Sequence, residues 1–526
     1  MAEEGTGTVS IANGGRLTVT NAGGVCIASK NTSKGTLILS PGGTYEATTA
    51  YGGSGDDTFV FNGGTFKMLS NAKASTLIQS SVGRRLTTPL GGAIDTAGKG
   101  DFTLPVALTA ATRAEDLAAT ITHRWRFDDG SLADCVGNSD ATVSGTVNWT
   151  NGAVRLLGTA NGTSSINLGA GVLPTGGRGA TIEMWVTQLE RRHWARFICA
   201  GPSSTFWFAS NRGLASGVAN KEGWLSINGT SGAYTHQDYE LVNGMTYHMA
   251  IVFEKQLDDT WLITVSMRDA TTGELIDSAT TTAPASWSFD KIDQAGGIWL
   301  GHSAAVADPD PYMDYHDVRI YNCAMTPEQL AASCAAGSEA HFYLMKKGAG
   351  MLTLSGANTY TAGTGVDGGT LTLASGATLP ATEMWAGAGA TLKLNTTAQT
   401  ARELGGSGTV KDGTLAVTGT IQPGGRHAIG TLTMNGTSLT SGTLVIDTAA
   451  DGTSDCLAVT GTLDLSNLSL KLGDANLNEG SVYTLATAAE ITGTFQNMNV
   501  PKRWRVSVHP TKVTLAYSNG TALILR

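Results

Sequence analysis

Two glutamates are the first residues in this chain whose type and spacing suggest catalysis. Glu183 and Glu190 occur in the run EMWVTQLE, and a glycoside hydrolase needs two carboxylates that flank the bond it cleaves. Residues at an odd separation on a regular strand point to opposite faces, so these two carboxylates are not expected to meet. The sequence also contains no Gly-x-Ser-x-Gly, His-Glu-x-x-His or phosphate-loop motif. We therefore expect that the protein is not an enzyme.

A second group of residues suggests carbohydrate recognition. Exposed aromatic rings stack on the faces of sugars, and neighbouring polar groups fix the sugar hydroxyls. Trp194 is the ring that we expect to be exposed, because three basic or titratable residues precede it. Core packing is the competing explanation for the tryptophans, and we predict it for Trp185, Trp261 and Trp299, which lie within expected strands. The candidate glycan-binding residues are Arg191, Arg192, His193, Trp194, Asn211, Arg212, Trp224, Tyr234 and His236.

Two acidic loops contain the oxygen ligands that a hard cation such as Ca²⁺ prefers. Solvated loop side chains are the competing explanation for both loops, and we favour it. The first loop contains Asp134, Asn138 and Asp140, and the second contains Asp308, Asp310 and Asp314.

Composition excludes several classes of function. The chain has 526 residues, too many for one core, so two or three domains are expected. A net charge of −9 without a basic patch argues against a nucleic-acid partner, and no apolar run is long enough to span a membrane. The six cysteines include no Cys-x-x-Cys pair, so a structural zinc site is not expected. Cys323 and Cys334 flank a short predicted helix and are candidates for a disulfide, with Cys135 as a rival partner.

The elements that must position these residues are short strands separated by glycine-rich turns. Met351–Leu354 and Thr370–Leu373 alternate polar and apolar residues, so one row of side chains points inward. Similar strands recur at intervals of roughly 20 residues, which is typical of β-solenoids whose rungs stack to bury a core. They return at Arg16–Val19, Thr36–Leu39, Thr65–Met68, Thr391–Leu394, Thr414–Val417, Thr431–Met434, Thr443–Ile446 and Thr462–Leu465.

The run GAGMLTLSGANTYTAGTGVDGGTLTL resembles the passenger-associated β-strand repeat of bacterial autotransporters. This resemblance implies a right-handed parallel β-helix that is exported to the cell surface. The segment Met1–Gly5 lacks the basic and apolar regions of a signal peptide. We therefore expect that a signal was removed, with export by another route as the alternative. We also expect that the chain is a passenger-like piece, or belongs to a lineage whose repeats travel without an outer-membrane anchor.

Residues 120–340 differ from the repeats and are expected to form a domain inserted into a turn of the solenoid. Nine of the eleven tryptophans fall between Trp125 and Trp299, which indicates a globular core. Short alternating strands such as Thr181–Val186 and Thr246–Phe253 indicate an antiparallel sandwich. The predicted fold class is all-β: a parallel β-helix at 1–119 and 341–526, interrupted by a β-sandwich jelly roll at 120–340.

The inserted region also resembles a known family. HRWRFDDGSLADCVGNSDATVSG, TIEMWV and LGHSAAVADPDPYMDYHDVRIYNCAMTPEQLAA are similar to parts of a laminin-G-like, concanavalin-type jelly roll. The closing part is the most specific, because a short helix capped at Thr326-Pro327 follows it. Relatives of this jelly roll often hold a structural Ca²⁺ where the first and last strands meet. The resemblance therefore implies Asp317 as a metal ligand. Asp134 and Asp140, from the first acidic loop described above, are further candidates.

These expectations combine into one interpretation. The protein is expected to be extracellular or on the bacterial outer surface, with a β-helix stalk that carries a jelly roll. The jelly roll is expected to bind host or environmental glycans or glycoproteins. Two alternatives stay open: a purely structural or assembly passenger, and a divergent polysaccharide-degrading enzyme. An aromatic-rich face would favour glycan binding, a close carboxylate pair in a cleft would favour the enzyme, and an apolar patch would favour assembly.

Overall fold

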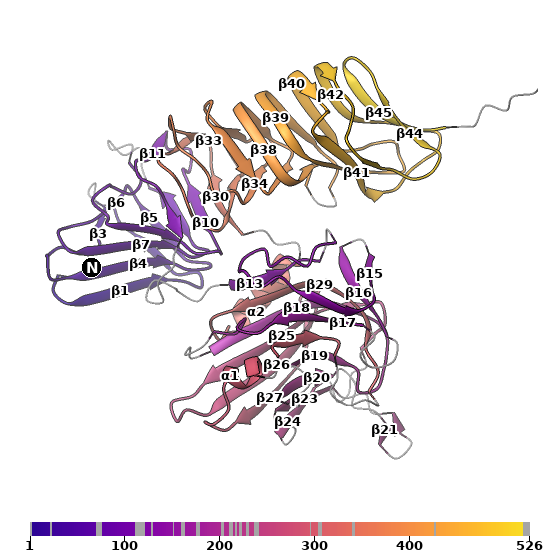
Figure 1. Ribbon diagram of the computed structural model, residues 1–526. Helices are drawn as coiled ribbons and strands as arrows, with labels where there is room; N and C mark the ends of the chain where they lie inside the picture. Colours follow the sequence, from indigo (N-terminus) through magenta and orange to yellow (C-terminus); the bar gives the residue numbers. More distant parts are fainter. Residues whose placement is uncertain are drawn as a thin grey trace, which may run out of the picture. The chain divides into compact units, whose positions relative to one another are not determined.

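The protein consists of two compact units, one formed by Met1–Ala118 with His341–Arg526 and the other by Ala119–Ala340. Strands make up nearly all of the regular structure in both (Figure 1). The computed structural model describes residues 3–20, 24–69, 76–110, 121–127, 130–150, 152–158, 164–174, 179–200, 205–209, 214–215, 218–219, 223–227, 231–235, 241–294, 296–302, 308–338, 342–425 and 428–518.

The first unit is a parallel β-solenoid, which confirms the predicted fold class. Its longest ladder, here called the long sheet, joins one strand from each successive rung in parallel register. The strands of the long sheet are β2 (Arg16–Thr18), β5 (Thr44–Ala47), β8 (Thr65–Met68), β10 (Gly92–Asp95), β30 (Tyr343–Lys347), β32 (Gly363–Val366), β34 (Glu383–Ala386), β37 (Glu403–Gly406), β38 (Thr409–Pro423), β39 (Thr431–Thr448), β41 (Leu468–Ala475) and β43 (Met498–Asn499).

Further ladders complete the rungs. One runs through β1 (Thr6–Ile11), β4 (Lys34–Leu39), β7 (Asp56–Phe61), β9 (Arg84–Thr87) and β12 (Thr109–Ala110). Another includes β11 (Phe102–Leu104), β31 (Met351–Leu354), β33 (Thr370–Leu373), β35 (Thr391–Lys393), β40 (Cys456–Asp464) and β42 (Val482–Thr492). Short strands lie at β3 (Val25–Cys26), β6 (Ala50–Tyr51) and β36 (Ala398–Ala401). Antiparallel strands β44 (Trp504–Val508) and β45 (Lys512–Tyr517) end the described part.

The Thr-Leu-x-Leu strands build the solenoid core as their alternation predicts. Leu352, Leu371 and Leu392 lie in register on β31, β33 and β35, and each is at most 1% exposed. One rung cannot bury such a row by itself, so each leucine depends on the rung before and the rung after it. The ladder also continues across the insert, because β10 pairs with β8 on one side and with β30 on the other.

The second unit is an antiparallel β-sandwich with two sheets. The back sheet contains β13 (Ile121–Trp125), β15 (Val147–Thr150), β16 (Ala153–Leu157), β18 (Gly179–Glu190), β25 (Thr246–Lys255), β26 (Trp261–Asp269), β27 (Leu275–Ala283) and β29 (Tyr312–Tyr321). The front sheet contains, in spatial order, β14 (Thr142–Gly145), β17 (Ser164–Gly169), β28 (Ile298–Leu300), β19 (Arg196–Ala200), β20 (Phe206–Ala209), β23 (Gly223–Ile227) and β24 (Ser231–Thr235). A small hairpin joins β21 (Leu214–Ala215) to β22 (Val218–Ala219).

Apolar residues from both sheets share one core, as in other sandwiches. In the described part of this unit, two helices accompany the sheets, α1 (Phe289–Gln294) and α2 (Pro327–Ala336). The predicted cap of α2 is present, because Thr326 and Gln329 form a reciprocal capping box with Pro327 at the first helical position.

The structure also bears on the predictions about a disulfide and about membrane-spanning segments. All six cysteines are free thiols, so the suggested bridge between Cys323 and Cys334 does not form. Within the ranges given above, no helix has the length and hydropathy needed to cross a bilayer.

Candidate functional site

The outer face of the front sheet carries an unusual set of large aromatic side chains. Strand β20 reads Phe-Trp-Phe-Ala, and Phe206 and Phe208 point into the sandwich core. Side chains alternate along a strand, so Trp207 points to the opposite, outer face. The same alternation places Trp224 of β23 and Trp299 of β28 on this face, since their strand neighbours Leu225 and Leu300 lie in the core.

These rings gather into one cluster, here called the tryptophan face: Trp194, Trp207, Trp224 and Trp299. Trp207 is 8% exposed, and the other three are partly buried and pack around Trp207 and Cys199. The register explains the grouping, because Cys199 lies opposite Trp299 on one side and opposite Trp207 on the other. Trp194 comes from the turn before β19, and its ring centroid is 6.1 Å from that of Trp207. Strands β19, β20 and β23 lie side by side in Figure 1.

Polar groups border the tryptophan face. The Arg196 guanidinium lies 4.5 Å from the centroid of the Trp207 ring, and its Nη2 is 3.5 Å from Asp308 Oδ2. His302 packs beside Trp299, with ring centroids 5.0 Å apart, and burial lowers the pKa of His302, which favours neutral imidazole at neutral pH. Among the described residues, Trp299 Nε1 and His302 Nδ1 are buried without a hydrogen-bond partner. Buried groups of this kind usually have a partner, so these two nitrogens are unsatisfied polar atoms at the border of the tryptophan face.

The structure brings together only some of the predicted glycan-binding residues. Trp194 and Trp224 belong to the tryptophan face, whereas Trp194 is partly buried instead of exposed. Arg191, Arg192 and His193 are also partly buried, and Arg192 pairs with Glu190 at 3.0 Å. Tyr234 lies opposite Trp224 in the β23–β24 register, but its side chain is outside the described structure, as are Asn211, Arg212 and His236.

Sequence reasoning missed other members of this surface. Trp299 was predicted to be core, which is wrong because its side chain lies on the outer face of β28. Trp185 and Trp261 are buried as predicted, at 1% and 4% exposure. Trp207 was not singled out, although the Phe-Trp-Phe alternation identifies it as the residue that points away from the two phenylalanines.

Glu183 lies on the outer side of the back sheet, beneath helix α2, and not in an open cleft. Its carboxylate is 0% exposed, accepts a hydrogen bond from Ser333 at 2.7 Å and lies 3.0 Å from His248 Nε2. Burial raises the pKa of Glu183, but His248 and the charge of Arg319 outweigh it, so the pKa is below its ordinary value. Serine and histidine both bind the carboxylate, so the histidine is not placed to activate the serine. Glu190 is exposed at the end of β18, away from this network.

Asp317 belongs to the same buried network. Its carboxylate accepts hydrogen bonds from Arg124 Nη2 at 3.0 Å and from Arg319 Nε at 2.7 Å, and Asp317 is 0% exposed. A Ca²⁺ ligand must offer its oxygens to the cation, whereas here two guanidinium groups already neutralise them. The implied calcium site therefore does not fit Asp317.

Asp134 and Asp140 also have other partners. Asp134 Oδ1 accepts from the backbone amides of Arg124 and Gly137 at 3.0 and 2.8 Å, and Asp134 Oδ2 is 2.6 Å from His123 Nδ1. Asp140 is exposed and accepts a hydrogen bond from the Asp134 amide. In the second loop, Asp310 accepts from the Ser164 amide and Asp314 pairs with Arg155. Over the described ranges, no three His, Cys, Asp or Glu side chains form a group that could hold a metal ion.

Comparison with known families identifies one segment of the solenoid. Residues 344–373, which span β30 to β33, match the family model of the passenger-associated-transport-repeat. No curated protein matches the chain.

Several solved structures are similar to about two fifths of the chain. Domain 4 of AbnA, an extracellular GH43 arabinanase from Geobacillus stearothermophilus solved with arabinotriose, is 18% identical with a TM-score of 0.30, over 41% of this chain and 98% of that one. The binding domain of botulinum neurotoxin DC in complex with SialylT is 13% identical with a TM-score of 0.24, over 41% and 51%. Trypanosoma rangeli sialidase is 10% identical with a TM-score of 0.28, over 43% and 35%. Scores this low assign no function to the present chain.

Proposed function

We propose that this protein is a secreted or surface-displayed passenger whose sandwich binds glycans through the tryptophan face. The observation that carries the proposal is the gathering of four tryptophans on the outer side of one sheet, where they do not contribute to the main core. The passenger-type repeat at residues 344–373 supports export, because it is the segment that resembles exported proteins.

The chemistry of this face suits a carbohydrate. A sugar ring has an apolar C–H face that stacks on indole, and hydroxyls around its edge that need polar partners. Arg196, Trp299 and His302 border the rings and carry polar groups of the kind that pair with sugar hydroxyls. A ligand that combines flat apolar faces with many oxygens meets both features.

The proposal is one of binding without cleavage. A glycoside hydrolase needs two carboxylates that flank one bond, and Glu183 is instead held by Ser333 and His248 beneath α2. Asp308, which lies beside the tryptophan face, is paired with Arg196.

The test is binding of the full-length protein to an array of neutral and acidic glycans, with calcium and with a chelator. The variants are Trp194→Ala and a matched control, Trp149→Ala, because Trp149 is 40% exposed on β15 of the back sheet. We expect selective binding of at least one glycan, which Trp194→Ala abolishes for that glycan and which Trp149→Ala and the chelator leave intact.

A blank array from protein that melts cooperatively would refute glycan binding. Equal loss of binding in both variants would place the site elsewhere than the tryptophan face. If the array is blank, size-exclusion chromatography with light scattering tests the rival function, because an assembly passenger self-associates and an isolated lectin does not need to.

A further inference from the structure

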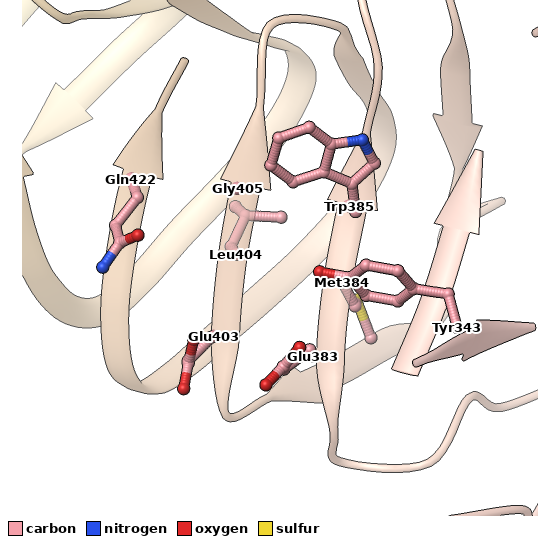
Figure 2. Close-up of a pocket in the computed structure, with 8 residues that line it drawn as sticks. All are labelled: Tyr343, Glu383, Met384, Trp385, Glu403, Leu404, Gly405 and Gln422. Atoms are coloured by element: carbon pink, nitrogen blue, oxygen red, sulfur yellow. The ribbon is translucent and has the colours of Figure 1, made fainter. Parts of the chain in front are cut away.

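An aromatic pocket lies on the outer face of the long sheet, in the solenoid unit. Its lining residues come from β30, β34, β37 and the end of β38, and Figure 2 shows them on neighbouring strands. Met384 and Leu404 point into the solenoid core at 1% exposure each. Alternation therefore directs Glu383, Trp385, Glu403 and Gly405 outward.

Glycines make room for the two aromatic rings of this pocket. A Cβ atom added to Gly405 would lie 3.2 Å from Trp385 Cε3, and one added to Gly425 would lie 2.6 Å from Trp385 Cη2. Tyr343 covers Gly363 in the same way, since a Cβ at Gly363 would contact the tyrosine ring. The indole thus rests against a backbone that has no side chains beneath it, and Figure 2 shows it beside Gly405. A ring supported in this way is held as a fixed platform.

Hydrogen-bonding groups lie next to the platform. Glu383 and Glu403 are register partners on adjacent strands, and their side chains lie side by side in Figure 2. Arg402 bonds Glu383 Oε1 at 2.9 Å and lies 3.8 Å from Glu403 Oε1, which orients both carboxylates. Gln422 follows Gly405 in the register and adds an amide at the next rung.

The charges of these groups limit the ligand. Two carboxylates would repel an acidic ligand. The Arg402 guanidinium would repel a cation, and it already neutralises part of the charge of the two carboxylates. A neutral polyhydroxylated ring avoids both conflicts, because its hydroxyls can donate to carboxylates and accept from the amide. The enclosed hollow has room for about one water molecule, so a sugar would lie across its mouth, on the one indole that lines it, Trp385.

We propose that this solenoid pocket binds one pyranose ring of a neutral oligosaccharide, stacked on Trp385 and hydrogen-bonded by Glu383, Glu403 and Gln422. The site belongs to a different unit from the tryptophan face and does not depend on it. The chain would then hold two separate sugar-binding surfaces, one on each unit.

The test uses ¹⁹F NMR of the full-length protein labelled with 5-fluorotryptophan, because each of the eleven tryptophans gives its own resonance. Trp385→Phe assigns the Trp385 signal. The probes are neutral hexasaccharides of glucose, mannose and xylose, and tetramethylammonium as a cationic alternative. We expect one hexasaccharide to shift the Trp385 resonance saturably, independently of any shift at Trp194 or Trp207.

Two glycine variants separate binding from folding. Gly405→Val places a branched side chain against the indole, and we expect it to weaken binding about tenfold or more. Gly461→Val is the matched control on β40, where an added Cβ meets nothing within 4 Å, and it should bind as the wild type does. The proposal is overturned if no hexasaccharide moves the Trp385 resonance at about 10 mM, if Gly405→Val binds normally, or if only tetramethylammonium binds.

Discussion

Replacement of Asp317 by asparagine is expected to destabilise the sandwich strongly. The Asp317 carboxylate pairs with Arg124 and Arg319, and the side chains of all three residues are at most 4% exposed. Loss of the anion leaves two buried guanidinium groups, of which Arg319 still interacts with the carboxylate of Glu183. Breaking a buried ion pair costs ~3–5 kcal/mol, and asparagine keeps some hydrogen bonds, so the lower figure applies. For a unit the size of Ala119–Ala340, about 3 kcal/mol lowers Tm by roughly 6–12 °C.

Tryptophan fluorescence during thermal unfolding measures this change in the full-length protein. Nine of the eleven tryptophans lie between Trp125 and Trp299, so the signal reports mainly the sandwich. Asp314→Asn is the matched control, because Asp314 pairs with Arg155, whose side chain is 29% exposed. Solvent screens that pair, and the control should cost only about 1 kcal/mol, or roughly 2–4 °C.

The same melts test calcium. If Asp317 is bound by arginines alone, a chelator leaves the wild-type Tm unchanged while Asp317→Asn still lowers it. The reasoning is refuted if the chelator lowers the wild-type Tm as much as the substitution does. It is also refuted if the Asp317→Asn and Asp314→Asn variants have the same Tm.

Two further predictions concern the solenoid. Burial raises the pKa of Asp455 from 3.8 to about 7, so the stabilisation it contributes is complete below about pH 4 and is lost as the pH rises through 7. The urea midpoint of the solenoid should therefore fall over that interval in the wild type and less in Asp455→Asn, and equal slopes would contradict this assignment. Leu404→Ala removes a side chain that is 1% exposed and should cost ~2–5 kcal/mol. Because rungs contact only their neighbours, hydrogen exchange should accelerate first in β34, β37 and β38, and uniform acceleration would count against this local effect.

The solenoid could be predicted because its signal is local. Thr370–Leu373 and Thr65–Met68 are strands β33 and β8 with the predicted bounds, since each repeat carries its own alternation and turn glycines. Nearest-neighbour stacking then leaves few other arrangements for such strands. The closing helix of the sandwich was predictable for the same reason, because Thr326, Pro327 and Gln329 form its cap within one turn.

The sites were harder to predict because they depend on residues far apart in the chain. Alternation along β28 shows that Trp299 and Leu300 point to opposite faces of the strand. Only the pairing of β28 with β17 and β19 decides which of the two faces packs on the core. Asp317 lies 193 residues from Arg124, and no spacing rule connects them. The pocket at Trp385 depends on glycines in later rungs, which the sequence analysis had assigned only to turns.

The continuous ladder across the insert has a consequence for the order of assembly during synthesis. The Met351 amide bonds Asp101 Oδ1 across 250 residues, whereas a regular rung spans about 20. Closure entropy grows only with the logarithm of length, so the longer loop costs only about 2 kcal/mol more at equilibrium. The inserted length has a larger effect on the time at which the two strands can pair. At ~5–20 residues per second, a ribosome needs roughly 10–50 s to pass from Asp95 to Tyr343. Strand β10 therefore waits for its neighbour β30 while the sandwich is made, and the N-terminal rungs keep an open edge during that interval.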